Sequence, residues 1–408
     1  MTTLAPRILG AKPAVGGFIA IAALCISAGL VWQSASTVKR LYEPSPTKTA
    51  APALSGHSPD DAPYPPQDAL PGARDVETPY GSIRVYEWGP KDGDRVLFVH
   101  GMSTPVVAFG DLAHEMVSRG YRIMMFDLFG RGYSDAPIDL TYDTRLYVTQ
   151  LLLVIASSDI SWTASPGFRL VGYSLGGGLC VAFTRYFPHL VRSLCLIAPG
   201  GLIRRHHIGW WSWFYYDSGL LPEILVKYLV RRRIRPRPKP VGVVGGPTTM
   251  PAGGEGTVNG DGDRSGGAQF DSAPISKTRP DITVASVVAW QVDNHEGFVT
   301  ALLSSFRNAP VYAAPEDWEA LSEVLKERGS GSAVDPDKAG LEGGKVLIVL
   351  GKDDVVVVPD EFIEDAYAAL GQDKLDITFL EGGHELPFKS AGIIAASIDS
   401  AWKAGKTQ

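Results

Sequence analysis

The sequence contains few cysteines, and none of them is arranged like a metal ligand. Only three of the 408 residues are cysteines, and no pair of cysteines and histidines has the spacing of a zinc site. Cys25 lies in an apolar N-terminal run, whereas Cys180 and Cys195 lie in apolar segments of the body. We interpret these last two as buried free thiols, with a disulfide or a reactive cysteine as the alternative. The sequence therefore indicates neither a metal ion nor another cofactor.

An excess of basic charge is also missing. The chain has 44 acidic and 38 basic residues, for a net charge of −6, and it contains no Asn-x-Ser/Thr sequence for glycosylation. This balance provides no general attraction for nucleic acid, which we therefore exclude as a partner. Hydrophobic residues make up 45% of the chain, which is typical of globular proteins, and the length allows one large or two ordinary domains.

Acidic residues are absent from the first 42 positions. Within them, residues 14–32 form an uncharged, apolar run of 19 residues, close to the roughly 20 residues that span a bilayer. The apolar region of a cleaved signal peptide is usually shorter, at about 7–15 residues. We therefore predict that residues 1–42 are a single-pass N-terminal membrane anchor, with a cleaved signal peptide or a mitochondrial presequence as the alternative. Basic residues flank the run on both sides, so its orientation stays open.

Residues 43–72 are rich in proline, alanine and serine, and we predict a disordered tether there. The pattern then changes. Apolar runs predict strands at residues 81–89, 95–100, 121–127, 168–173 and 191–199, and again within 345–359 and 375–388. Helical spacing predicts helices at residues 111–120, 143–158 and 174–187. This alternation predicts an α/β fold with a mostly parallel central sheet and helices on both faces.

A lone serine stands between glycines in the stretch GYSLGG, residues 172–177. Ser174 follows a predicted strand and precedes a predicted helix. At such a tight turn, side chains at Gly172 and Gly176 would collide with the neighbouring backbone, and the serine hydroxyl projects above the sheet. A turn without chemistry would need no serine at its apex. The context therefore favours a nucleophile.

A serine hydroxyl is a weak nucleophile unless a histidine takes its proton and an acid orients that histidine. Two later strands end in such residues. The run KVLIVLGKDD (345–354) ends in two aspartates, and the run LDITFLEGGH (375–384) ends in His384. Because the carboxyl ends of parallel strands meet at one edge of a sheet, we expect Ser174, one aspartate and His384 to converge there.

Hydrolysis through a serine also needs hydrogen-bond donors for the oxyanion. The backbone N–H of Leu175, at the start of the helix after the serine, is one candidate. The backbone N–H of Met102 is the other, because Gly101 allows the loop after the strand 95–100 to turn that N–H inward.

Five motifs in this order resemble the α/β-hydrolase superfamily, over residues 81–200 and 345–400. They are HGMS (100–103), DLFGRGYSD (127–135), GYSLGG (172–177), GKDD (351–354) and GGHELPF (382–388). The resemblance implies the α/β-hydrolase fold and a serine mechanism. Related epoxide hydrolases and haloalkane dehalogenases place an aspartate at the nucleophile position, and Ser174 argues against both.

The resemblance also implies roles for individual residues. Family members place the triad acid three residues after the glycine that ends the strand, which indicates Asp354. An extra valine before Pro359 departs from the family's spacing, so Asp353 stays the alternative. His100 is expected to brace the oxyanion loop, and neither Asp127 nor Arg131 is expected to take part in catalysis.

The region between the two halves of the resemblance determines the substrate. We expect a first part of the core at residues 73–200, a helical cap at 201–310 and a second part of the core at 311–408. Within the cap, the aromatic stretch at the start of 208–230 forms either a lid that contacts an apolar acyl group or an ordinary helix packing. The glycine-rich residues 236–280 are predicted to be a disordered insertion.

Together these features predict a membrane-anchored serine hydrolase with a Ser174–His384–Asp354 triad and no cofactor. Its expected substrate is a small carboxylic ester of an apolar acid, cleaved through an acyl-enzyme. The same residues perform acyl transfer or cofactor-free C–C bond hydrolysis in related enzymes, so these activities are the alternatives. A ligand-binding or scaffold member of the fold is the non-enzyme alternative, and it would be free to lose Ser174 or His384.

Overall fold

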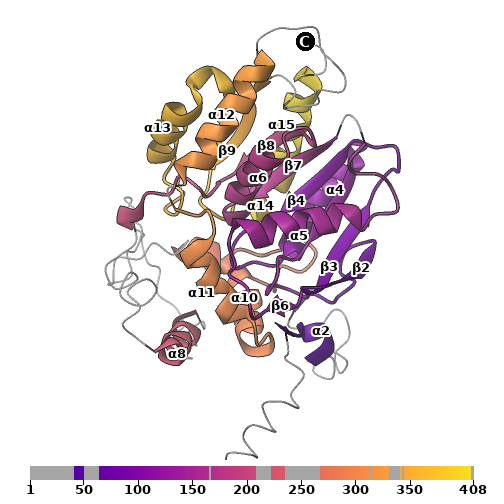
Figure 1. Cartoon of the computed structure of the whole chain (residues 1–408), viewed down its shortest axis with the longest axis vertical. Coiled ribbons are helices and arrows are strands. Elements are labelled where there is room, and N and C mark those ends of the chain that lie inside the picture. The colour runs from indigo at the N-terminus through magenta and orange to yellow at the C-terminus, as the bar shows by residue number, and fades with distance from the viewer. Residues whose placement is uncertain are drawn as a thin grey trace, which may run out of the picture. The chain divides into compact units, whose positions relative to one another are not determined.

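An eight-stranded sheet runs through the computed structural model of the chain (Figure 1). The structure describes residues 41–49, 64–164, 167–207, 222–234, 267–312, 314–329, 341 and 344–405. The strand order across the sheet is β10-β9-β8-β7-β4-β5-β3-β2. The strands are β2 (Ala73–Thr78), β3 (Gly81–Trp88), β4 (Arg95–Val99), β5 (Arg122–Phe126), β7 (Phe168–Tyr173), β8 (Val191–Ile197), β9 (Val346–Gly351) and β10 (Leu375–Leu380).

The sheet is mostly parallel, as predicted. The pairs from β5 through β4, β7, β8 and β9 to β10 are all parallel, and only β3 and β2 run antiparallel to their neighbours. Every residue of β7 and β9 is buried, and apart from Arg169 their side chains are apolar or absent, which suits strands covered on both faces of the sheet. All seven predicted strands are present, and β2 adds an edge strand that the sequence analysis did not predict.

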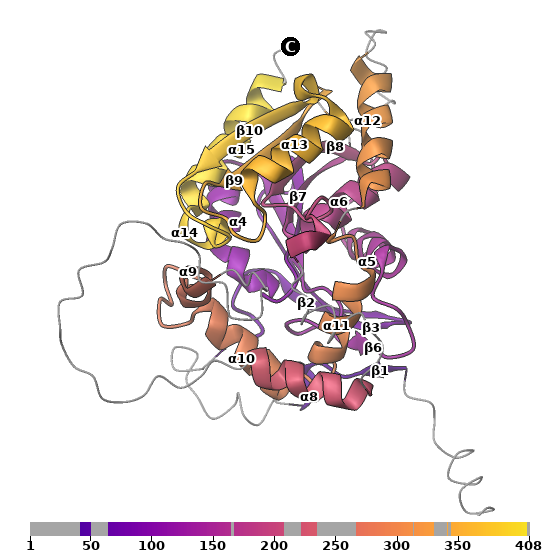
Figure 2. The ribbon, with the colours of Figure 1, turned by 90° about the vertical axis from the view of Figure 1, so that its left-hand side faces the viewer.

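Two groups of helices cover the two faces of the sheet (Figure 2). Helices α4 and α15 pack together on one face, while α5, α6, α12 and α13 form a continuous layer on the other. Their bounds are α4 Gly110–Ser118, α5 Thr144–Ala156, α6 Leu175–Tyr186, α12 Pro315–Gly329, α13 Pro359–Leu370 and α15 Ala391–Gly405. Short helices complete the core at α2 (Pro46–Thr49), η1 (Val106–Phe109), η2 (Arg205–His207), η4 (Gln372–Lys374) and α14 (Leu386–Lys389). The three predicted helices correspond to α4, α5 and α6.

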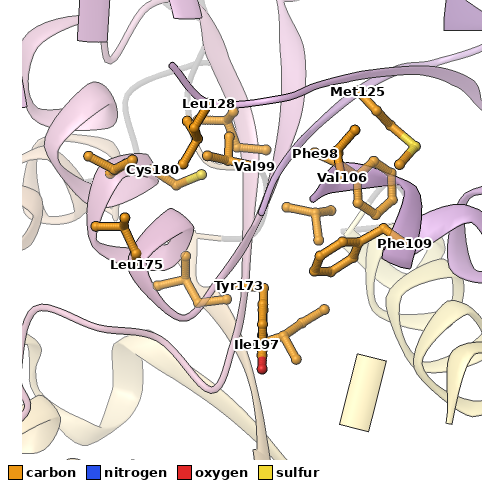
Figure 3. Close-up of a cluster of buried hydrophobic side chains, with 14 of the residues drawn as sticks. Phe98, Val99, Val106, Phe109, Met125, Leu128, Tyr173, Leu175, Cys180 and Ile197 are labelled. Carbon is orange, nitrogen blue, oxygen red and sulfur yellow. The ribbon is translucent and has the colours of Figure 1, made fainter. Parts of the chain in front are cut away.

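A cluster of buried hydrophobic side chains lies where β4 and β7 meet α6 (Figure 3). Figure 3 shows Phe98 and Val99 from β4 and Tyr173 from β7 among these packed side chains. Tyr173 and Leu175 are both buried, so the chain is held firmly on either side of Ser174. The loops that follow these strands therefore start from fixed positions.

Four helices are inserted between β8 and α12. They are α8 (Glu223–Ile234), α9 (Gly267–Ser272), α10 (Val284–Asn294) and α11 (Phe298–Asn308), and together we call them the helical insert. They gather at the end of the unit where β6 also lies (Figures 1 and 2). The side chain of Gln291 on α10 bonds to Ser103 in the loop after β4, which places the insert over the carboxyl ends of the strands.

The prediction of a disordered tether is wrong for residues 43–49. Here β1 (Tyr42–Glu43) pairs with β6 (Ala136–Pro137), and the N–H of Ser45 donates to Asp135 Oδ1 at 2.7 Å. These contacts use main-chain groups and one buried carboxylate. A composition that is poor in aliphatic residues therefore does not prevent them.

Residues 64–72 also depart from the predicted tether. Tyr64 is fully buried, and its ring stacks on Trp290 with centroids 3.9 Å apart. One aromatic side chain is enough to attach this stretch, since rings of that size bury a large apolar area. Residues 50–63 lie outside the described residues.

Residues 14–32, which are predicted to span a membrane, also lie outside the described residues. Within the described ranges, no helix is both long enough and apolar enough to cross a bilayer. Cys180 and Cys195 are buried free thiols, as predicted, and burial raises the pKa of the Cys180 thiol well above its usual range.

Candidate active site

Ser174 occupies the tight turn between β7 and α6. Its φ of 52° lies in the left-handed region, where few residues other than glycine are found. Such strain persists only where the surroundings enforce it. Here the buried neighbours Tyr173 and Leu175 hold the turn from both sides.

The two flanking glycines permit the close approach of three backbone segments. A Cβ atom on Gly172 would lie 2.5 Å from the carbonyl oxygen of Gly176. A Cβ atom on Gly176 would lie 2.1 Å from the carbonyl oxygen of Val99 in β4. Any side chain at either position would therefore push the turn away from the neighbouring strand, as the sequence analysis expects.

The structure brings Ser174, His384 and Asp354 together. Nε2 of His384 lies 3.1 Å from Ser174 Oγ, and Nδ1 lies 2.8 Å from Asp354 Oδ2. An ionised carboxylate only accepts hydrogen bonds, so Nδ1 carries the ring proton and Nε2 is left to accept from the serine hydroxyl. This arrangement can remove a proton from Ser174.

Asp354, and not Asp353, faces the imidazole. Asp354 is almost fully buried, and its Oδ1 accepts from the N–H groups of Val356 and Val357 at 2.8 and 2.9 Å. Asp353 is exposed, and its backbone N–H donates to the carbonyl of Gly382. The additional valine of the sequence is accommodated in the turn after Asp354, so it does not shift the acid.

The two candidate oxyanion amides lie beside the nucleophile. Among the described residues, neither Leu175 nor Met102 donates its N–H to another protein group. The carbonyl of Ser174 accepts from Gly177 and Gly200, both at 2.8 Å, and because the peptide is planar this fixes the direction of the Leu175 N–H. A Cβ atom on Gly101 would lie 3.3 Å from Ser174 Cβ, so the loop that carries Met102 is adjacent.

His100 braces that loop, as expected, and does not act on the serine. Its Nε2 accepts from the N–H of Leu128 at 2.8 Å, so Nδ1 carries the proton and donates to the carbonyl of Gly101 at 2.7 Å. Complete burial lowers the pKa of His100 to about 3, since desolvation disfavours the charged ring. The brace therefore stays neutral throughout the physiological range.

Asp127 is buried in the loop after β5, and its carboxylate accepts hydrogen bonds from backbone groups of the core. Its carboxylate accepts from the N–H groups of Val106 and Tyr133 at 2.8 and 2.9 Å. Burial raises its pKa to about 6, and the two N–H donors limit the rise. These partners agree with a structural role for the loop.

Phe270 of α9 is a site residue that the sequence analysis missed. Its ring centroid lies 5.6 Å from that of His384 and 6.2 Å from that of Phe388. The predicted disordered insertion at 236–280 is therefore wrong for residues 267–280. The glycine-rich composition ends at Gly267, and the apolar residues that follow provide the contacts. That change in composition was the available signal.

Residues 235–266 lie outside the described residues, and none of the site residues named above falls among them. Replacing residues 240–266 with a short Gly/Ser linker should keep kcat on a soluble ester within a few-fold of wild type. Loop length itself costs only about 0.6 kcal/mol per doubling. Extending the replacement to residue 278 removes Phe270 and should lower kcat/KM further. Steady-state kinetics of both variants test this, and a large loss with the shorter replacement would contradict it.

Within the described ranges, no group of three or more His, Cys, Asp or Glu side chains is placed to hold a metal ion. The predicted lid stretch 208–230 is described only from residue 222 onward, so its aromatic part lies outside the described residues. The site thus consists of Ser174, His384 and Asp354, two backbone amides and the covering ring of Phe270.

One protein family and several curated proteins are similar to this chain in sequence. A family model described as "Alpha/beta hydrolase family" matches residues 96–396. The chain is 31% identical over 112 residues to 2-hydroxy-6-oxo-2,4-heptadienoate hydrolase of Pseudomonas putida, which covers 27% of this chain and 39% of that protein. It is 29% identical over 122 residues to Lipase 1 of Psychrobacter immobilis, which covers 30% and 37%. The chain thus aligns with less than two fifths of the length of these curated relatives.

Among solved structures, that of a bacterial membrane phospholipase A is similar, with a TM-score of 0.53. The superposition covers 96% of this chain and 98% of that one, at 13% sequence identity. At this level of identity the likeness concerns the fold alone. It extends over almost all of both chains.

Proposed function

Since this chain belongs to the alpha/beta hydrolase family, we propose that it is a serine esterase that cleaves carboxylic esters of apolar acids through an acyl-enzyme. Membership of this family supports an enzyme of the α/β-hydrolase type. The proposal adds the nucleophile, the triad and the kind of substrate.

In the proposed reaction, Ser174 Oγ attacks the ester carbonyl carbon while His384 Nε2 takes the hydroxyl proton. Asp354 holds the ring in the required tautomer and stabilises the imidazolium. The N–H groups of Met102 and Leu175 donate to the oxyanion. The C–O bond to the alcohol then breaks, and His384 returns the proton to that oxygen. Water repeats the sequence on the acyl-enzyme and restores the free serine hydroxyl.

One observation carries most of this proposal. Ser174 Oγ, His384 Nε2, His384 Nδ1 and Asp354 Oδ2 form a continuous chain of contacts at 3.1 and 2.8 Å. It begins at a strained residue beside two amides that donate to no other protein group among the described residues. The strained backbone of Ser174 and the amide groups without a protein partner both cost free energy, and a turn with a purely structural role would need neither.

The preference for an apolar acyl group is supported by what covers the site. The ring of Phe270 lies beside His384, and the ring of Phe388 packs against Phe270. We propose that the helical insert, which carries Phe270, acts as the cap predicted from the sequence. The aromatic residues of the stretch 208–230 and the apolar run 14–32 agree with a lipid-like substrate. We accordingly propose that the protein works at a membrane, anchored through residues 14–32.

C–C bond hydrolysis is the second candidate. It is favoured by the relative from Pseudomonas putida, whose name describes a hydrolase of a 2-hydroxy-6-oxo-dienoate. The same serine and histidine would serve both reactions. The substrate therefore distinguishes the two activities.

A series of p-nitrophenyl esters from acetate to decanoate tests the proposed substrate. We expect kcat/KM to rise with acyl length by up to about fourfold per methylene, the equivalent of about 0.8 kcal/mol per buried CH₂. The rise should level off once the acyl group fills its pocket. Hydrolysis of a 2-hydroxy-6-oxo-dienoate without turnover of any ester would favour the second candidate and contradict the first.

A further inference from the structure

Three consecutive carbonyl groups in the loop after β4 each accept a hydrogen bond from a buried side chain. The pairs are His100 Nδ1 to Gly101 O at 2.7 Å, Arg131 Nε to Met102 O at 2.9 Å, and Gln291 Nε2 to Ser103 O at 2.9 Å. Loop carbonyls usually bond to water or to the main chain. Three consecutive carbonyl groups bonded to side chains therefore indicate that these side chains fix the orientation of the loop.

Holding a carbonyl also aims an amide. In a trans peptide the N–H points opposite to the preceding C=O, because the unit is planar. His100 thus sets the direction of the Met102 N–H through the carbonyl of Gly101. Arg131 holds the next peptide plane, so both dihedral angles of Met102 are fixed. Gln291 holds the plane after that and prevents the loop from turning as a unit.

Two of the three side chains that bond to these carbonyls are connected to the helical insert: Gln291 lies on it, and Arg131 bonds to it. Gln291 lies on α10, and its Oε1 also accepts from the N–H of Gly132 at 2.8 Å. The guanidinium of Arg131 donates to Ser305 Oγ on α11 at 2.9 Å. Gln291, Arg131 and Ser305 are all fully buried. The insert is therefore bonded to the loop that carries the Met102 amide, directly on one helix and through Arg131 on the other.

The loss of one hydrogen-bond acceptor of Arg131 is expected to disturb its other hydrogen bonds. Among the described residues, its guanidinium donates only to uncharged oxygens, namely Met102 O, Phe129 O, Tyr147 OH and Ser305 Oγ. A buried charge without a carboxylate partner depends on every one of these acceptors. If α11 moved away, the guanidinium would have to find a new arrangement, and the carbonyl of Met102 would move with it.

We propose that Gln291 and Ser305 are positioning residues for the oxyanion amide of Met102, so that the helical insert is part of the catalytic scaffold as well as a cover for the substrate. This inference rests on the proposed function. It follows that the Met102 donor is correctly aimed only while α10 and α11 are seated on the core, whereas the Leu175 N–H is fixed independently through the Ser174 carbonyl. The position of the insert then controls turnover.

Gln291→Met and Ser305→Ala test the proposal, because both replacements are close in size to the original side chain. Loss of a whole oxyanion donor costs about 10²–10³ in kcat, and a displaced donor should cost less. We expect kcat on a p-nitrophenyl ester to fall about 10- to 100-fold, with KM within about twofold. Affinity for an alkylboronic acid, whose tetrahedral adduct with the serine places an oxygen at the oxyanion position, should fall by the same factor as kcat.

Each variant has a matched control on the same helix. Asn294→Ala removes a side-chain amide of α10 whose one donated bond, in the part of the chain that the structure describes, goes to the carbonyl of Trp290 within the helix. Ser304→Ala removes a hydroxyl of α11 that accepts from the N–H of Tyr142 instead of Arg131. Both controls should keep kcat and boronate affinity within about twofold of wild type, so they separate loss of positioning from general weakening of the insert.

The outcomes are distinguishable from a failure of the proposed function. A wild-type protein that cleaves no ester and reacts with no fluorophosphonate would refute that function. An active wild type whose Gln291→Met and Ser305→Ala variants keep kcat, or change KM alone, would overturn the positioning role. A lower kcat with unchanged boronate affinity would overturn it too. If thermal unfolding shows that Gln291→Met does not fold, Gln291→Glu keeps the acceptor for Gly132 and carries the same test.

Discussion

Ser174→Ala should abolish covalent labelling by a fluorophosphonate probe and lower kcat on an ester by about 10⁶-fold. The probe bonds to an activated serine oxygen, and this variant removes the hydroxyl group that lies 3.1 Å from His384 Nε2. The fold should stay intact, because Cβ is kept and Oγ makes no other hydrogen bond among the described residues. In-gel fluorescence and steady-state kinetics measure the two effects.

Ser118→Ala is the matched control, since this serine is exposed on α4 and, within the described part of the chain, its hydroxyl bonds only to the carbonyl of Glu115 in its own helix. It should label and turn over like wild type. Equal labelling of the Ser174→Ala variant would place the reactive nucleophile elsewhere and contradict the proposed mechanism. Circular dichroism of both variants confirms that any loss is chemical.

Asp354→Asn should lower kcat by up to about 10⁴-fold, whereas Asp353→Asn should stay near wild type. An asparagine can keep Oδ1 toward the N–H groups of Val356 and Val357, which turns its NH₂ group toward His384 Nδ1. Nδ1 must then accept, the ring proton moves to Nε2, and Nε2 can no longer take the proton of Ser174.

The paired variants are compared by kcat on one ester, with thermal unfolding to show that both proteins fold. The two aspartates are neighbours in sequence and differ in burial, so the pair controls for a change of charge at this turn. A severe loss in Asp353→Asn with a mild effect in Asp354→Asn would contradict the assignment of the acid. The role of the serine would be unaffected.

The strands and the nucleophile were predictable because their signals are local. A buried parallel strand is a continuous apolar run, and the glycines around Ser174 report a steric limit set by Val99 and by each other. The choice between Asp353 and Asp354 does not have such a local signal. It depends on how one extra valine fits the turn, which only the three-dimensional course of residues 354–359 decides.

Other features depend on contacts between distant segments and left little trace in the sequence. Phe270 follows a glycine-rich stretch, and composition alone assigned it to that stretch. Gln291 and Ser305 look like ordinary polar positions in amphipathic helices. Their importance comes from Ser103 and Arg131, which are more than 170 residues away in sequence. Tyr64 is similar, because its partner Trp290 lies on the helical insert.

The pairing of β1 with β6 limits the length of the linker between the proposed membrane anchor, residues 14–32, and the folded part of the protein. If the predicted disordered tether extended to residue 72, the 40 residues 33–72 would form the linker, and fully extended they would reach at most about 140 Å from the bilayer. Attachment at Tyr42 leaves only the nine residues 33–41, which extend at most about 30 Å. An enzyme held through residues 14–32 would thus be confined to a thin layer above the lipid, where it meets esters that diffuse in two dimensions.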